Sequence, residues 1–287
     1  MRASAGRVRC DLHPGPLSPR VLSTGHGVAR VALVATRALL LGGDHVRVEV
    51  RVGEGVELEL VEVSGTVAYP GRGKSASWHV DVQVEAGGLL VWDALPFVVA
   101  QEADVDRHTN VVLGEDASAL LRETLVLGRS GETGGRVRSC TRTEREHADE
   151  LFAEDLDLGD DRALPGVLGA ARVVDSLLLV GTRAPAPDAG PRTGAGAGHL
   201  RLDLDGPGTV ARHLGAGTHE SGLDAVAARW ADAVRTARRA DAVPARYGPI
   251  DRVKDASRDL RDPSTSSQPE EQSVPTEGRS WDCCTNR

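Results

Sequence analysis

The stretch "HVRVEVRVGEGVELELVEV", residues 45–63, decides the fold because its apolar residues recur at every second position. Valine occupies each even position from Val46 to Val52, and charged residues occupy the positions between them. Alternation of period two is the pattern of a strand that buries one face. After a Gly-Glu-Gly turn the alternation resumes, then slips by one residue between Leu60 and Val61. The slip predicts a β-bulge in the second strand.

The same unit of strand, acidic glycine-containing turn and strand occurs three times. It reads "RVGEGVELEL" from residue 51, "VEAGGLLVW" from 84 and "VLGEDASALLRETL" from 112, about 30 residues apart. This repeat predicts stacked hairpins in a mainly β chain, a layered, β-helix-like array of strands with a few α-helices. An ordinary β-sandwich also fits the pattern, and the repeat alone does not separate the two.

One amphipathic helix is predicted near the C-terminus, in "SGLDAVAARWADAVRTARRA", residues 221–240. Ser221 precedes it as the expected N-cap. From Pro244 onward the sequence has almost no apolar residues, so it is predicted to be disordered. The domain prediction is therefore a β-rich domain over residues 1–243 and a polar tail over 244–287. The apolar positions at helical spacing are Leu223, Val226, Ala227, Trp230, Ala233 and Val234.

The composition narrows the class of protein. A formal charge of -8, with 42 acidic against 34 basic residues, argues against a nucleic-acid-binding surface as the main function. No apolar run reaches the roughly 20 residues that cross a bilayer, and the N-terminus lacks the apolar core of a secretory signal. We expect a soluble, cytoplasmic protein. The cysteines form neither a disulfide framework nor a zinc half-site, and the tail pair is interpreted as incidental; they are Cys10, Cys140, Cys283 and Cys284.

Several short motifs resemble functional sites but lack the context those sites need. Gly73-Lys74-Ser75 resembles the end of a phosphate-binding loop, yet Ala68 stands where that loop needs glycine, and a strand follows where a helix is needed. "GAGAGH", residues 194–199, has no βαβ context. The histidines form no His-x-His or His-x-x-x-His pair, and Gly-x-Ser-x-Gly is absent from the sequence. Nothing in these motifs requires an enzyme.

Four further motifs follow one another in a fixed order. They are a leucine run into Gly-Gly-Asp, the strand-turn-strand "VGEGVELELVEVSGTVAY", the segment "GGLLVWDALPFVVAQEADVDRHTNVVL", and "LVLGRSGETGG". In this order, over about residues 25–180, they resemble the urease accessory protein family UreD, called UreH in some organisms. The positions that carry the resemblance are Gly42, Gly43, Asp44, Tyr69, Pro96, Gly128 and Arg129.

The chain departs from the family pattern at two places. Residues 63–66, Val-Ser-Gly-Thr, replace the Thr-Gln often found after the second strand. The Gly-Arg…Gly-Glu element is compressed, so the resemblance is not carried over to Glu132.

The resemblance implies a maturation factor in place of a catalyst. Members of this family bind apo-urease and, with the helical partner UreF and the GTPase UreG, assist delivery of nickel to the urease active site. It also implies a large array of stacked β-strands. No tightly bound cofactor is expected, and Ni²⁺ would be held only transiently, because a fixed cage of imidazole and thiolate would retain it. Asp44 and His45 are the candidates for such a transient contact.

Two other functions remain open at this point. In a β-rich enzyme, Asp44 and His45 would be an acid/base pair, but neighbouring residues of a strand point to opposite faces. Asp44 is better interpreted as a turn residue whose carboxylate accepts backbone N–H groups. A stand-alone β-solenoid binding module, unrelated to urease, is the second alternative, and the repeat alone would support it.

Overall fold

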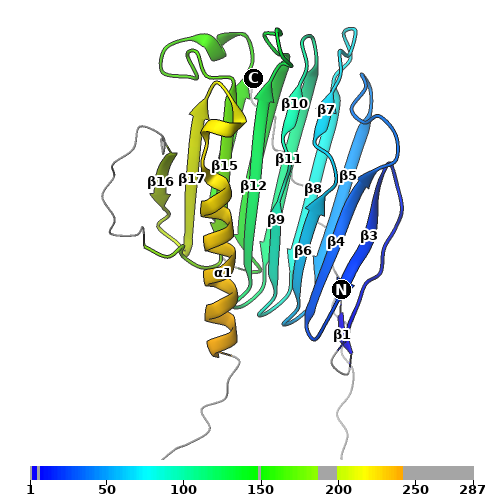
Figure 1. The fold of residues 1–287 in the computed structure, drawn as a ribbon, viewed down its shortest axis with the longest axis vertical. Coiled ribbons are helices and arrows are strands. Elements are labelled where there is room, and N and C mark those ends of the chain that lie inside the picture. Colours follow the sequence, from blue (N-terminus) through cyan, green and yellow to red (C-terminus); the bar gives the residue numbers. More distant parts are fainter. Residues whose placement is uncertain (1, 5–6, 148–149, 187–198, 242–287) are drawn as a thin grey trace, which may run out of the picture. The chain divides into compact units, whose positions relative to one another are not determined.

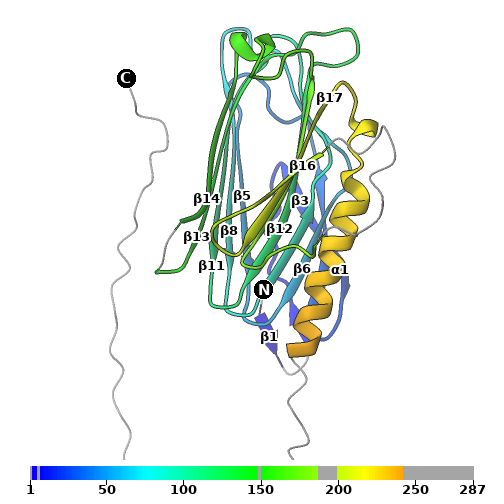
Figure 2. The same cartoon turned by 90° about the vertical axis from the view of Figure 1, so that its left-hand side faces the viewer.

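The computed structural model describes residues 2–4, 7–147, 150–186 and 199–241. The predicted tail at 244–287, with its cysteine pair, and most of "GAGAGH" lie outside the described residues. Residues 1–238 form one compact unit. It contains two facing β-sheets, a small two-stranded hairpin and most of one α-helix, α1 (Leu223–Asp241), which covers the outer face of one sheet (Figures 1 and 2).

The first sheet, the long sheet, has ten strands. Its main path runs β16 (His199–Asp203), β17 (Gly208–Gly215), β15 (Val173–Val180), β12 (Ser118–Leu127), β9 (Leu89–Asp93), β6 (Glu57–Glu62), β4 (Val28–Ala35) and β3 (Leu17–Thr24). The short strands β7 (Thr66–Ala68) and β10 (Phe97–Val99) extend it near one end.

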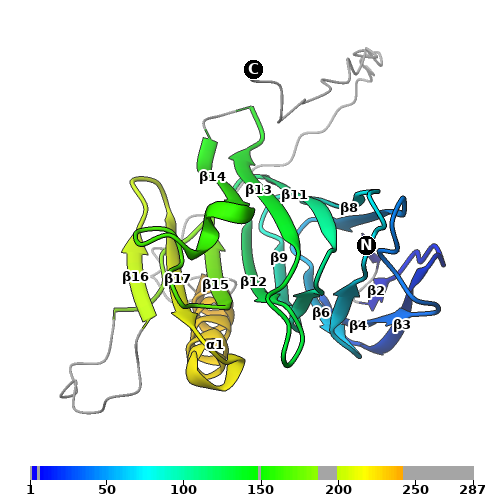
Figure 3. The ribbon, with the colours of Figure 1, turned by 90° about the horizontal axis from the view of Figure 1, so that it is seen from above.

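The second sheet, the short sheet, has five strands, and Figure 3 shows both sheets nearly end on. Its order is β14 (Glu150–Leu158), β13 (Arg136–Arg145), β11 (Asp104–Leu113), β8 (Ala76–Val84) and β5 (His45–Val52). A small hairpin of β1 (Arg2–Ser4) and β2 (Arg7–Arg9) precedes the sheets. Two 3-10 turns, η1 (Asp160–Ala163) and η2 (Thr218–Glu220), complete the elements.

The stacked, layered architecture predicted from the repeat is confirmed. Between β4 and β13 successive long strands fall in alternate sheets, so each coil contributes one strand to each sheet. The strands of neighbouring coils therefore pair in parallel. In the long sheet β4 pairs with β6, β6 with β9, and β9 with β12. In the short sheet β5 pairs with β8, β8 with β11, and β11 with β13. The strands that flank each repeated turn do not pair as hairpins, because the turn carries the chain from one sheet to the other.

The repeated turns themselves stack at one end of the molecule. The residues Gly55, Gly87 and Asp116 occupy equivalent turn positions and all have positive φ, at 64°, 60° and 53°. Hydrogen bonds link one turn to the next: the Gly55 amide donates to Ala86 at 2.9 Å, and the Gly87 amide donates to Glu115 at 2.7 Å. Glycine and aspartate tolerate this left-handed conformation, which explains why they recur in the turns.

The predicted β-bulge in β6 is wrong. Both ladders of β6 run without a register shift. Leu58 and Leu60 are buried between the sheets, and the next inward position is Glu62. The apolar pattern slips because the strand places a carboxylate in the interior, while Val63 beyond it is 61% exposed.

The predicted helix is confirmed, and it buries one stripe of side chains against the long sheet. The Ser221 hydroxyl accepts the Leu223 amide at 3.3 Å, which satisfies an otherwise unpaired donor at the helix start, although Gly222 stands between them. Salt bridges from Arg235 to Glu57 and Glu59 secure the second half of the helix. The helix residues buried in this interface are Leu223, Ala227, Trp230, Ala231 and Val234.

Candidate functional site

A group of ionisable and hydroxyl side chains lies between the two sheets, where apolar side chains would be expected. They surround a cavity of about 80 Å³, room for several water molecules. Aromatic and aliphatic side chains, among them Trp78 and Phe97, form the rest of the wall. We call this group the interior polar belt; its members are Glu62, Arg107, Glu123, Ser139, Glu154, Ser176 and Arg212.

One ion pair of the belt connects the short sheet to the long sheet through β11 and β12. Arg107 of β11 is 7% exposed, and its Nη1 lies 2.6 Å from the Glu123 carboxylate on β12. The Ser139 hydroxyl donates a longer hydrogen bond, 3.3 Å, to the same carboxylate. The Arg107 guanidinium also lies 4.3 Å from the centre of the Phe97 ring, a cation–π contact. Its Nε has no hydrogen-bond partner among the described residues.

A second ion pair of the belt joins the sheets near their β14 and β17 strands. The two terminal nitrogens of Arg212 donate to the two carboxylate oxygens of Glu154, each at 2.6 Å. The Arg212 Nε donates to the Ser176 hydroxyl at 2.9 Å. This bidentate geometry fixes both side chains more firmly than a single contact would.

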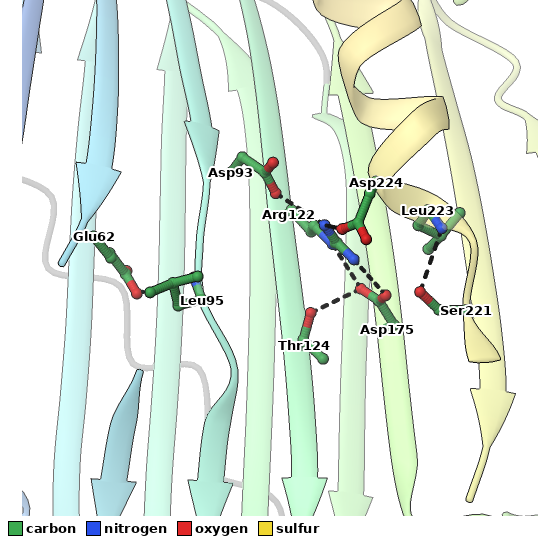
Figure 4. A network of polar contacts seen from close by, with 9 residues as sticks. All are labelled: Glu62, Asp93, Leu95, Arg122, Thr124, Asp175, Ser221, Leu223 and Asp224. Atoms are coloured by element: carbon green, nitrogen blue, oxygen red, sulfur yellow. Dashed lines mark hydrogen bonds and ion pairs between the residues drawn. The ribbon is translucent and has the colours of Figure 1, made fainter. Parts of the chain in front are cut away.

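Glu62 is the belt carboxylate without a basic hydrogen-bond partner. Its oxygens accept the indole N–H of Trp92 and the backbone amide of Leu95, both at 3.1 Å, and Figure 4 shows the second contact. Burial raises the pKa of Glu62, and these two hydrogen bonds only partly oppose it. Among the belt carboxylates, Glu62 is therefore the one whose charge is least compensated.

A different ionic network lies on the outer face of the long sheet, beneath the start of α1 (Figure 4). Arg122 donates to both oxygens of the fully buried Asp175, at 3.0 and 2.9 Å, and also contacts Asp93 and Asp224. Burial alone would raise the pKa of Asp175, but hydrogen bonds from Arg122 and from the Ser221 and Thr124 hydroxyls outweigh it and lower the pKa. Asp224 is on α1, so the network ties the helix to the sheet.

The residues predicted from the family motifs, Pro96 excepted, come together at one end of the coils, opposite the repeated turns. Backbone hydrogen bonds connect successive corners there: Tyr69 to Leu40 at 3.1 Å, Gly43 to Ser75 at 2.9 Å, and Gly128 to Val99 at 2.8 Å. Pro96 is the exception, because it lies between β9 and β10 within the long sheet, where its carbonyl accepts the Thr66 amide at 3.1 Å. The other motif residues lie at the corners at which each coil passes between the sheets.

Arg129 and Glu132 form a closed loop at one of these corners. The Glu132 carboxylate accepts the Arg129 guanidinium and the backbone amides of Arg129 and Gln101. The guanidinium and these amides lower the pKa of Glu132 to about 2. The family resemblance was not carried over to Glu132. In the structure this residue forms a salt bridge with Arg129 that closes the turn.

Asp44 and His45 make separate contacts. The Asp44 carboxylate accepts the Leu41 amide at 3.1 Å, as expected for a turn residue. His45 is exposed, and its Nδ1 lies 2.8 Å from the Ser77 hydroxyl on the neighbouring strand. The two side chains contact different partners, so their geometry does not support the acid/base hypothesis.

Gly42 stands where two corners touch, so we expect the substitution Gly42→Ala to destabilise the fold. A methyl group there would lie 2.6 Å from the Gly71 Cα, closer than non-bonded carbons approach. Forcing backbone apart in this way costs about 1–3 kcal/mol of unfolding free energy. Chemical denaturation of the purified chain measures the loss. Gly25→Ala is the matched control, since nothing lies within 4 Å of its added methyl, and equal stability of the two variants would contradict the prediction.

The residues of the interior polar belt were not predicted from the sequence as site residues. The available signal was a break in alternation, as at Glu62, or a charged residue at an inward position, as at Arg107 and Glu123. Period two shows which residues share a face, but the inward face is only known once the sheets are placed.

The described residues contain no helix long and apolar enough to cross a membrane.

The fold and this interior define a class of protein: a β-solenoid-like scaffold of two parallel-stacked sheets with a charged belt between them. The family model for the UreD urease accessory protein matches residues 3–247. The chain is 48% identical over 233 residues to urease accessory protein UreD 1 of Streptomyces griseus, covering 79% of this chain and 88% of that protein. It is 38% identical over 235 residues to urease accessory protein UreD of Frankia alni, covering 74% and 73%. The chain belongs to the UreD family of urease accessory proteins.

Proposed function

We propose that this chain is a scaffold that binds apo-urease and, with UreF- and UreG-type partners, assists insertion of nickel into the urease active site. Membership of the UreD family supports the general role in urease maturation. The observation that carries the finer proposal is the interior polar belt, with its cavity of about 80 Å³ between the sheets. An apolar interior would repel an ion, whereas carboxylates and hydroxyls replace part of its hydration shell.

The arrangement of the belt favours transient handling over storage. Glu123 and Glu154 already bind arginines at 2.6 Å, so an ion would have to compete with a salt bridge for either of them. Among the described residues, no three His, Cys, Asp or Glu side chains form a ready metal cage. A divalent ion that meets such groups one after another is released more readily than from a cage of imidazole and thiolate. The chain would therefore bind Ni²⁺ as cargo, without a resident cofactor.

The proposal includes a non-catalytic role in the cytoplasm. The GTPase chemistry would reside in the UreG-type partner, which fits the rejected phosphate-loop resemblance at Gly73-Lys74-Ser75. In the structure that segment is a turn followed by β8, with no helix start to hold phosphate.

Co-expression in a urease-negative host tests the proposal. Urease structural subunits are produced with the two partners, with and without this chain, and nickel content and urea hydrolysis are measured on the purified urease. We expect both to rise several-fold when the chain is present. Pull-down on tagged apo-urease should recover the chain in the same cells. Unchanged nickel content on omitting the chain would refute the proposal.

Glu62→Gln tests the part played by the belt. Glutamine keeps the shape and an acceptor oxygen for Trp92 or Leu95 but removes the only belt carboxylate that lacks a basic hydrogen-bond partner. We expect nickel incorporation into urease to fall several-fold while the thermal stability of the chain changes little. The matched control is Glu115→Gln, at an exposed turn, which should leave incorporation unchanged. Equal incorporation by the two variants would remove Glu62 from the path of the ion.

A further inference from the structure

Strand β5 is the outermost strand of the short sheet, and no described strand pairs with its other side (Figure 1). A groove of about 920 Å³ runs along it, and the lining of this groove includes five successive residues of β5, 47–51. Because successive residues of a strand point to opposite faces, a groove that meets all five passes around the edge of the strand. This edge therefore has room for another strand.

The strands at the other three ends of the two sheets carry features that hinder such pairing. β3 contains Pro19 and a register shift between Val21 and Ser23, β14 has a register shift against β13, and β16 has five residues. Proline, irregular register and short length are the usual protections of an edge strand. β5 has eight residues, no proline and an unbroken register against β8. Of the four, it is the strand best suited to pair with another chain.

The backbone of β5 directs its odd-numbered residues toward this open edge. The carbonyls of Asp44 and Val52 accept the amides of Ser77 and Glu85 on the β8 side, at 2.9 and 2.8 Å. Hydrogen-bonding direction alternates along a strand, so the even-numbered residues of β5 bond to β8. The odd-numbered residues between them, which are charged or histidine, direct their amides and carbonyls away from β8.

We propose that β5 pairs with β5 of a second copy of this chain, antiparallel, about a two-fold axis at Val48. In this register Arg47 of each protomer lies opposite Glu49 of its partner, and opposite charges across a strand pair stabilise it. A shift of two residues would place either Glu49 or Arg47 opposite its own copy. A shift of one residue would place valines opposite charged side chains. The charges of the strand are therefore complementary to themselves in one register.

The backbone and the side chains of β5 favour this same register. Arg47 and Glu49 both direct their backbone groups to the open edge, so they form the hydrogen-bonded pairs of the new ladder, and Val48 forms the close pair on the axis. Val48 is half-buried in the single chain and lines the groove, so pairing removes apolar surface from water. The Arg47 and Glu49 side chains are 66% and 57% exposed, and thus accessible from across the axis. One pair of strands is smaller than a standard interface, so we expect a reversible dimer.

Val48→Cys tests the register directly, in full-length chain that also carries Cys10→Ser, Cys283→Ser and Cys284→Ser. On the axis the two Cβ atoms would lie about 4.5–5.5 Å apart, close to the separation in a disulfide. Mild oxidation should therefore convert most of the chain to a covalent dimer. The matched control is Gln83→Cys in the same background, an exposed position on β8, one strand from the edge. Equal cross-linking of the two variants, or none in Val48→Cys, would overturn the proposal.

Charge exchange tests the pairing without a cross-link. Sedimentation equilibrium of the full-length chain should show a dimer whose dissociation constant rises several-fold in Glu49→Arg, because arginine then lies opposite arginine. Adding Arg47→Glu should restore the parent value, since the charges are complementary again, and circular dichroism verifies the fold of each variant. A parent chain that stays monomeric at its highest soluble concentration, or whose mass rises beyond two copies, would contradict the proposal. Neither test contains urease, so their failure leaves the proposed function untouched.

Discussion

Arg122→Ala is expected to destabilise the folded chain by about 3–5 kcal/mol, the usual cost of removing one partner from a buried ion pair. Asp175 is fully buried and accepts two hydrogen bonds from this guanidinium, its basic partner, at 3.0 and 2.9 Å. After the substitution its charge would remain in the interior with only hydroxyl partners. The helix would also lose the link through Asp224. Equilibrium denaturation at pH 7 measures the effect as a shift of the midpoint.

Two controls separate the buried charge from other effects of Arg122→Ala. Arg30→Ala removes an exposed arginine that pairs with Glu59, and should cost at most about 1 kcal/mol. The double variant Arg122→Met with Asp175→Leu removes both charges and fills the volume, so it should recover much of the lost stability. If Arg122→Ala alone were as stable as the parent chain, the network would have no structural role.

Trp230→Ala, made alone in the parent chain, is expected to lower the unfolding free energy by about 3–5 kcal/mol. This is the usual range for deleting a large buried aromatic side chain. Trp230 is 1% exposed and is the largest side chain between α1 and the long sheet. Sheet residues such as Leu120 and Leu177 form the surface beneath the helix. Because this interface is closely packed, the helix cannot move far enough to fill the cavity that the substitution leaves. Thermal unfolding and denaturant midpoints report the loss.

Thr236→Ala is the matched control on the same helix. Thr236 is exposed, so its substitution should stay within about 0.5 kcal/mol of the parent chain. Trp230→Ala should also increase amide hydrogen exchange over residues 223–238 more than in the short sheet, because the helix is held mainly by this interface. Uniform loss of protection in both sheets would show instead that α1 folds as one unit with the whole array.

Local sequence patterns predicted the strands and the helix well. Alternation at 46–52 identified β5, and the repeated turns identified the coil length, because both features depend on residues close together in the chain. The helix from Leu223 was visible for the same reason. The bulge expected at Leu60–Val61 was wrong because the local pattern gives no sign that Glu62 has a partner in Trp92, 30 residues away.

The sequence by itself determined the strands, their turns, the helix and the family, since each is written in short-range periodicity or in the order of motifs. The tertiary structure alone decided which sheet each strand joins and which residues face the interior. It paired Arg107 with Glu123 and Arg212 with Glu154, and it placed β5 at an edge of the short sheet. Parallel stacking brings together residues about 30 positions apart, and a pattern read along the chain cannot show the register between coils.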